Sequence, residues 1–168
     1  MSDQERPWPP TEIRPLTMVD LELSHRILAE VFAEDEPVPS WEQGDASLLA
    51  TCRGCIEVEA FGVRKYPDLP SAAAKLFYST IKLHAFPNGN KRFALVLTIG
   101  LLVKHGARLT VPQGLGSAVA KWVADSDPHS RTGDPDGMIG ALTKFYADNL
   151  VPWKPDEPWV ILPEGDSN

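Results

Sequence analysis

The longest uncharged apolar run of the chain, residues 93–103, constrains the fold more than any other feature. It is shorter than the ~18 apolar residues that a membrane helix needs, so it predicts a helix in a protein core. Its apolar residues lie on every side of that helix, which indicates that other helices surround it. Gly100 in the middle costs about 1 kcal/mol relative to alanine, and we expect a neighbouring helix to approach closely there.

Helical patterns occupy most of the remaining chain. Thr17 and Asp20 form a capping-box pattern before the first helix, which should stop before Pro37, and Gly106 is a natural stop for the fourth helix. The expected N-caps of later helices are Asp45, Ser71 and Asp136. The sequence predicts helices at about residues 18–36, 45–60, 72–84, 90–105, 117–125 and 136–149. Since no alternating strand pattern appears, we expect an all-α fold around the buried central helix.

Proline marks both ends of the predicted domain. Residues 1–15 form a proline-rich arm, residues 16–151 the folded domain, and residues 152–168 a proline-rich acidic tail that we expect to be irregular. Three residues of this tail are candidates for packing against the folded domain: Trp153, Trp159 and Val160. Within the domain, residues 108–111 predict a short extended piece.

The net charge of −7 and the two cysteines bear on partners and location. An acidic chain repels the nucleic-acid backbone, which argues against direct nucleic-acid binding but allows a local basic pocket. Cys52 and Cys55 are too few for a four-cysteine zinc site, and we expect two small core residues in a reducing compartment. The N-terminus lacks the basic start and apolar run of a signal peptide, so we predict a soluble cytoplasmic protein without a membrane segment.

The stretch His84-Ala85-Phe86-Pro87-Asn88-Gly89-Asn90-Lys91-Arg92 joins the third and fourth predicted helices. Its second half lies at a helix N-terminus, where backbone N–H groups and the helix dipole attract anions. The positive charges of Lys91 and Arg92 are unfavourable beside the positive end of that dipole, and a phosphate ligand would offset this repulsion. Gly89 allows the backbone to approach a ligand closely. The imidazole of His84, just before the turn, is a candidate general base for a hydroxyl.

Each part of this stretch has an ordinary structural explanation when it is taken alone. Asn-Gly usually marks a turn, Lys-Arg usually faces solvent, and a single histidine at a helix end is usually structural. We apply that structural or solvated interpretation to His25, His105 and His129, and a solvated helix position to Lys82. The whole nine-residue string at one helix junction favours a binding site instead.

The string resembles the signature of the Fic/Doc family, His-x-Phe-x-(Asp/Asn/Glu)-(Gly/Ala)-Asn-(Gly/Lys)-Arg, and meets every position of it. The likeness to Doc, the death-on-curing toxin, extends over about residues 17–150. The resemblance implies a helical Fic fold with a possible short β flap at residues 61–70. In the family that flap holds the target chain as an added strand, although an ordinary surface loop is an equal alternative here.

The resemblance also implies a role for each residue of the string. His84 would take the proton from a Ser, Thr or Tyr hydroxyl of the target, and Phe86 would anchor the loop in the core. The nucleotide ATP would be bound by Asn88, Gly89, Asn90, Lys91 and Arg92, of which Lys91 and Arg92 also serve catalysis. Asn88 stands where most members have an acidic ligand of Mg²⁺, and a neutral amide binds that cation more weakly.

Two features favour a Doc-like kinase over the AMP-transferring Fic enzymes. Lys91 stands where most Fic proteins have glycine, and residues 93–95 lack the second arginine of many AMP transferases. The resemblance then implies transfer of the γ-phosphate of ATP to a threonine of elongation factor Tu, which blocks translation. The chain has no (Ser/Thr)-x-x-x-Glu-(Gly/Asn) inhibitory motif, so we expect a separate antitoxin. The alternatives are AMPylation of a target hydroxyl, or a nucleotide- or antitoxin-binding module weakened by Asn88.

Overall fold

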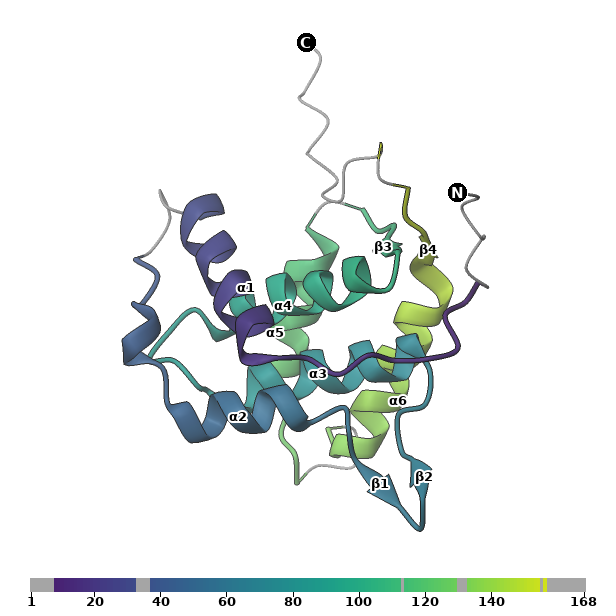
Figure 1. Cartoon of the computed structure of the whole chain (residues 1–168). Coiled ribbons are helices and arrows are strands. Elements are labelled where there is room, and N and C mark those ends of the chain that lie inside the picture. The colour runs from purple at the N-terminus through teal and green to yellow at the C-terminus, as the bar shows by residue number, and fades with distance from the viewer. Residues whose placement is uncertain (1–7, 33–36, 113, 130–132, 155, 157–168) are drawn as a thin grey trace.

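The computed structural model describes residues 8–32, 37–112, 114–129, 133–154 and 156 (Figure 1). Its helices are α1 (Met18–Val31), the 3₁₀ helix η1 (Trp41–Gln43), α2 (Ala46–Gly54), α3 (Leu69–Leu83), α4 (Asn90–Lys104), α5 (Leu115–Asp125) and α6 (Pro135–Asn149). Two short antiparallel pairs join β1 (Glu59–Ala60) to β2 (Val63–Arg64) and β3 (Ala107–Leu109) to β4 (Leu150–Pro152). The expected all-α fold with a small β flap is therefore confirmed.

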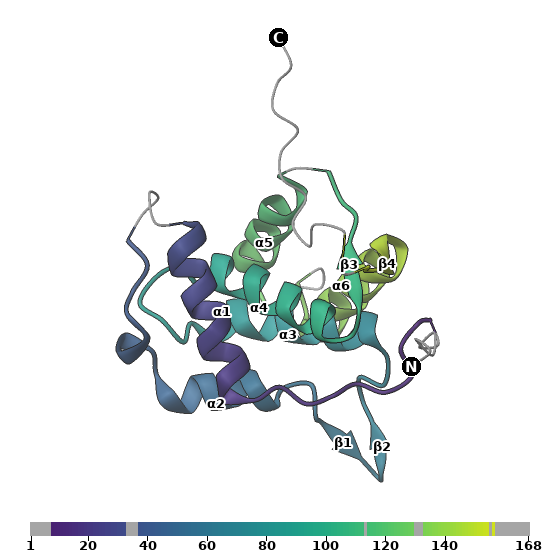
Figure 2. The same ribbon diagram turned by 45° about the horizontal axis from the view of Figure 1, so that its top comes forward.

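Helix α4 lies at the centre of the fold, between α1 on one side and α3 on the other (Figures 1 and 2). Phe93, Leu97 and Leu101 are almost completely buried, as the apolar run predicted. The expectation of burial on every side is wrong for one face, where Ile99 is half-buried and Gly100 is exposed. This face stays open because α1 and α5 meet α4 on either side of it and leave hollows along both seams.

Helix α1 approaches α4 closely at Gly100, as expected. A Cβ atom at that position would lie 3.4 Å from the Ser24 hydroxyl of α1, at the edge of normal van der Waals contact. Ser24 in turn donates to the carbonyl of Asp20 (2.8 Å), so its hydroxyl is satisfied inside α1. The capping box at Thr17 and Asp20 is formed in full, which starts α1 at the residue that the sequence indicates.

Helices α3 and α6 begin before the caps that the sequence suggested. The N-cap of α3 is Asp68 rather than Ser71, and the N-cap of α6 is Asp134 rather than Asp136. In both helices a proline, Pro70 or Pro135, occupies the first turn. Proline is favoured there because its missing N–H would have no intrahelical acceptor, so it lies inside these helices instead of ending the preceding loop.

Helix α2 ends at Gly54, six residues before the expected end at Ala60, and the chain then forms the β1–β2 hairpin. Both central residues of the hairpin turn, Phe61 and Gly62, have positive φ (53° and 76°). This combination is typical of a tight turn that follows the right-handed twist of its strands. The hairpin projects from the body, and the Phe61 side chain at its tip is fully exposed (Figure 1).

Both segments that flank the helical body contact it. Strand β4 pairs with β3, so Pro152, expected in an irregular tail, lies opposite Ala107. The next residue, Trp153, donates its N–H to the carbonyl of Gly106 (2.8 Å). At the other end, Ile13 and Leu16 of the N-terminal segment are buried against the body. Two of the tail residues proposed to pack on the body, Trp159 and Val160, lie outside the described residues.

Cys52 and Cys55 are free and buried, which confirms them as small core residues. Burial disfavours a charged thiolate and raises the pKa of Cys55 to about 12, so neither reactivity nor metal binding is favoured at neutral pH. Among the described residues, no helix combines the length and apolar character required to cross a membrane.

Candidate active site at the α3–α4 turn

The turn between α3 and α4 begins at His84, which caps the C-terminus of α3. His84 has φ 51° and ψ 51°, the left-handed conformation that commonly ends a helix but is uncommon for residues other than glycine. This conformation directs the chain out of α3 and leaves the imidazole exposed at the start of the turn. A non-glycine residue held in this region is a form of backbone strain that often accompanies functional sites.

Phe86 anchors the turn in the core. Its ring stacks on His25 of α1 (centroids 5.1 Å apart) and meets Phe93 of α4 edge to face, also at 5.1 Å. Trp41 of η1 completes the group, 6.0 Å from the Phe86 ring. The Nε2 atom of His25 lies 2.8 Å from the carbonyl of Pro39, which fixes the imidazole inside this aromatic group. His25 is therefore a structural residue, as predicted, and it supports the site from behind.

The chain before α2 closes on the same turn. Asp45 donates its backbone N–H to the carbonyl of Ala85 (2.8 Å), which joins the start of α2 to the site. Gly44 packs so tightly that an added Cβ would lie 2.7 Å from Phe86 Cε1 and 2.9 Å from Leu49 Cδ1. Sequence reasoning missed Gly44 and Trp41, because these contacts link segments about 40 residues apart and leave no local pattern.

Asn90 holds the turn in its compact shape. Its Oδ1 accepts from the N–H of Phe86 (3.0 Å), and its Nδ2 donates to the carbonyl of Phe86 (2.8 Å). The Asn90 side chain is buried, so these bonds are shielded from water. Both ends of this amide are thus engaged within the protein, and a contact from Asn90 to an anion would come from its backbone N–H.

The N-terminus of α4 is suited to an anion. Its N-cap is Gly89, with φ 75°, which offers no side-chain acceptor to the first-turn N–H groups, and that turn has no acidic residue. Side chains do cap the N-termini of four other helices, namely Thr17 for α1, Asp45 for α2, Asp68 for α3 and Asp134 for α6. The positive end of the α4 dipole is therefore open to an external anion such as phosphate.

The two basic side chains of this turn have different surroundings. Lys91 is exposed, and its interaction with the described residues is the electrostatic attraction between its ammonium and the Asp125 carboxylate. Arg92 is half-buried, and its guanidinium lies 6.0 Å from the ring centroid of Phe32, at the end of α1. The Arg92 side chain also lies close to Gly89, since a Cβ there would be 3.7 Å from Arg92 Nη2.

The C-terminal end of α5 lies close to the same basic group. A hydrogen bond from Lys121 holds the pKa of Asp125 below its usual range, and the positive charges of Lys91 and Lys82 lower it further. Asp125 is thus an acidic neighbour of Lys91, and no local sequence pattern indicated it because the two residues lie on different helices. Lys82, expected at a solvated helix position, is half-buried, and its ammonium donates to the carbonyl of Ser126 (2.7 Å) at the end of α5.

The residues present suit a divalent cation only as a companion of bound phosphate. Asn88 is exposed in the turn and supplies one neutral oxygen. Among the described residues, no group of three or more His, Cys, Asp or Glu side chains is arranged to hold a metal ion. Mg²⁺ commonly binds through few protein ligands and completes its shell with water and nucleotide phosphates. Such an ion fits here if the nucleotide carries it and Asn88 adds one ligand.

Comparison with known proteins bears on the family of the chain. A family model described as the Fic/DOC family matches residues 16–102, just over half of the 168 residues. The match runs from the segment before α1 into α4, so it includes the whole turn from His84 to Arg92. No curated protein and no solved structure matches the chain. The fold agrees with this match, since it has a buried central helix α4, a β hairpin and the turn from His84 to Arg92 that precedes α4. The chain therefore belongs to the Fic/Doc family, whose members transfer a group from a nucleotide to a target.

Proposed function

We propose that this protein is a Doc-like kinase that transfers the γ-phosphate of ATP to a Ser or Thr hydroxyl of a target protein. The observation that carries the proposal is Lys91. Its ammonium is exposed in the first turn of α4, where most Fic proteins have glycine, and it forms no salt bridge with the described residues, although Asp125 lies near it. A positive side chain beside the open helix end favours the most highly charged part of ATP, the β- and γ-phosphates.

In this proposal the charge of the transferring phosphoryl group is neutralised at the start of α4. The backbone N–H groups of the first turn, the Lys91 ammonium and the Arg92 guanidinium would face the phosphate oxygens. Bound Mg²⁺ would supply further neutralisation of the triphosphate, with Asn88 as the protein oxygen at hand. The rigid turn, held by Asn90 and Phe86, would keep these donors in place without reorganisation during the reaction.

His84 would act as the general base. Its exposed imidazole would accept the proton of the target hydroxyl while that oxygen forms a bond to the γ-phosphorus. The bond between the γ-phosphorus and the bridging oxygen breaks in the same step, and ADP leaves. The proposed target is a translation factor such as elongation factor Tu, with the β1–β2 hairpin as the segment that holds the target strand. We also propose a cytoplasmic location and a separate antitoxin that restrains the enzyme.

Two other functions remain in competition. AMP transfer would use the same base and the same phosphate-binding helix end but would cleave between the α- and β-phosphates. A binding module with little turnover would be explained by Asn88, because a neutral amide holds Mg²⁺ less firmly than a carboxylate.

Transfer of radioactive label distinguishes these functions. The purified protein, a His84→Ala variant and a Lys91→Gly variant are incubated with Mg²⁺, cell extract or purified elongation factor, and ATP labelled on the α- or the γ-phosphate. Label from the γ-phosphate alone, reduced about 10²–10⁴-fold by His84→Ala, is the expected result. Label from the α-phosphate in the wild-type protein contradicts the kinase proposal. The Lys91→Gly variant tests the argument from Lys91, because it should lose γ-transfer and gain α-transfer if this side chain selects the orientation of the nucleotide.

A further inference from the structure

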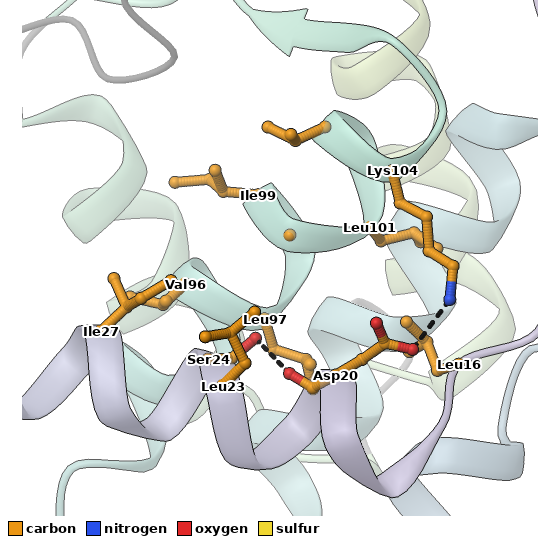
Figure 3. Close-up of a pocket in the computed structure, with 12 residues that line it drawn as sticks. Leu16, Asp20, Leu23, Ser24, Ile27, Val96, Leu97, Ile99, Leu101 and Lys104 are labelled. Carbon is orange, nitrogen blue, oxygen red and sulfur yellow. Dashed lines mark hydrogen bonds and ion pairs between the residues drawn. The ribbon is translucent and has the colours of Figure 1, made fainter.

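The open face of α4 carries two apolar hollows outside the candidate active site. One, of about 330 Å³, lies between α1 and α4 (Figure 3), and the other, of about 310 Å³, lies between α4, α5 and β3. The two hollows share Ile27, Val96, Ile99 and Val103, so they meet along one seam of α4. We call this continuous feature the α4 groove; it is lined by the residues of both hollows, which meet at these four shared residues.

The side chains around the α4 groove are mostly apolar and remain accessible. Figure 3 shows Leu23 and Ile27 on α1 and Val96 and Ile99 on α4 along its walls. Leu23 is 50 % exposed, and Val31, which lines the second hollow, is 63 % exposed. At one end of the groove, Lys104 Nζ forms an ion pair with the Asp20 carboxylate (2.8 Å). An apolar surface of this kind is stabilised when another apolar segment covers it.

The C-terminal tail of the same chain contains an apolar segment suited to such a groove. Residues 159–162, Trp-Val-Ile-Leu, are consecutive large apolar residues, with a proline on each side and acidic residues beyond. The continuous description of the chain ends at Lys154, one residue after Trp153, which is hydrogen-bonded to Gly106 just beyond the C-terminus of α4. The last continuously described residues therefore lie beside Gly106, three residues after Val103 of the α4 groove.

The length of the tail matches the groove. Trp159 follows Trp153 by six positions, which allows a reach of about 20 Å when the chain is extended at ~3.3 Å per residue. The groove from Val103 to Leu95 extends along eight residues of α4, or about 12 Å at 1.5 Å per residue. Four extended residues, 159–162, span about 13 Å, so they cover this length from within the same chain.

We propose that residues 159–162 of the C-terminal tail dock in the α4 groove of the same molecule and cover the open face of the central helix. The short connection gives the tail a high effective concentration at the groove, which favours it over an unlinked apolar partner. The same docking removes both the groove and the Trp-Val-Ile-Leu run from water. The groove reaches Phe32, next to which the Arg92 guanidinium lies, so the docked tail would end near the candidate active site without being part of it.

Disulfide trapping in the full-length chain tests this docking. Ile161→Cys is combined with Leu23→Cys in the groove, and in a matched control with Val63→Cys on the β1–β2 hairpin. Val63 is also exposed (68 %), and the hairpin lies at the opposite end of the molecule from β4 (Figure 1). The native Cys52 and Cys55 are buried and should not interfere. A disulfide within one chain is expected for the Leu23 pair and not for the Val63 pair.

Two results would overturn the proposal. Equal yields for the two pairs would mean that the tail has no preferred site, and a disulfide that joins two chains would mean that a second copy supplies the tail. Amide hydrogen exchange gives a test that needs no cysteine. Replacement of Val160 and Leu162 by Asp should speed exchange at residues 96–103 about tenfold, whereas Ser167→Asp should not. Unchanged exchange in the double variant would contradict docking.

Discussion

Asn90 shows how a signature residue can act on the backbone rather than on a ligand. Its amide closes the turn by two hydrogen bonds to Phe86, four positions earlier, and it is buried together with that residue. The turn in turn places Gly89 at the N-cap of α4 and His84 at the end of α3. The position of the donors in the candidate site therefore depends on a side chain whose own polar atoms face inwards.

Replacement of Asn90 by alanine should lower both stability and activity. The change leaves a buried N–H and a buried carbonyl of Phe86 without partners, at a cost of about 1–3 kcal/mol each. Chemical denaturation should show the loss in unfolding free energy, and nucleotide binding should weaken as the turn opens. An exposed neighbour, Asn88→Ala, is the matched control, since no hydrogen bond of its side chain supports the turn. Equal unfolding free energies for the two variants would count against the structural role of Asn90.

Asn88 offers a separate prediction about Mg²⁺. Replacement by Asp supplies a charged oxygen, which hard cations favour, at an exposed position that does not support the fold. The Mg²⁺ concentration for half-maximal transfer should fall several-fold in Asn88→Asp. If the wild-type protein is only a binding module, this variant should show transfer where the wild type shows none. A Mg²⁺ dependence identical to that of the wild type would remove Asn88 from the proposed metal site.

Three segments pack around Phe86 and hold the turn in place, and we call them the clamp. Helix α1 supplies His25, the segment before α2 supplies Gly44, and α4 supplies Phe93, all in contact with or next to Phe86. Dense packing of this kind transmits small displacements, because a core has few voids that could absorb them. The geometry of the site is thus set by helix packing as much as by its own residues.

Gly44→Ala tests this clamp. The new methyl group would lie 2.7 Å from the Phe86 ring, and such over-packing costs about 1–3 kcal/mol. Displacement of Phe86 should also lower the rate of transfer, although Gly44 belongs to none of the proposed ligand-binding residues. Gly54→Ala in the neighbouring α2 is the control, since an added Cβ there would meet no described atom within 4 Å apart from its chain neighbours and its own helix backbone. Similar thermal midpoints and rates for both variants would contradict the clamp.

At the scale of the whole molecule, three hydrogen bonds attach the N-terminal segment before α1 to the end of α4 and to β2. Arg14 donates its backbone N–H to His105 Nε2 (2.9 Å), Lys104 donates to the carbonyl of Pro15 (3.1 Å), and Arg64 donates to the carbonyl of Ile13 (2.9 Å). His105 must be neutral to accept this bond, and its Nδ1 lies 2.8 Å from the carbonyl of Leu101. Desolvation lowers the pKa of His105 from the usual 6.5, helped by the nearby Arg14 and Lys104.

The unfolding free energy should therefore depend on pH in the range where His105 titrates. Below about pH 6.5 the unfolded chain binds the proton more readily than the native protein, so stability present at higher pH is lost as the pH falls. Denaturant unfolding at pH 7.5 and 5.5 should show this decrease, and it should be smaller in His105→Gln. A decrease of equal size in that variant would assign the effect to other groups. The pKa of Asp20 is lowered from 3.8, so this carboxyl contributes to the pH dependence of the unfolding free energy only at more acidic pH.

The part of the fold that depends on local pattern could be predicted from the sequence. The apolar run of residues 93–103 indicated the central helix, and Thr17 with Asp20 marked the start of α1 correctly, because a cap acts within one turn. The start of α3 was predicted too late, since Pro70 suits the first turn of a helix as well as a loop. The end of α2 was predicted too late as well, because the hairpin after Gly54 has strands of only two residues.

For the candidate site, the sequence determined the chemistry and the tertiary structure decided the geometry. The residue types from His84 to Arg92 and their place between two helices indicate a base beside an anion site, because both properties follow from local helix ends. Contacts between distant segments decided which side chains remain available: Asn90 turns inwards, Lys82 caps α5, and Asp125 lies near Lys91. They also decided that one face of α4 stays open, since packing of α1 and α5 against it is set by the whole chain and not by the periodicity of one helix.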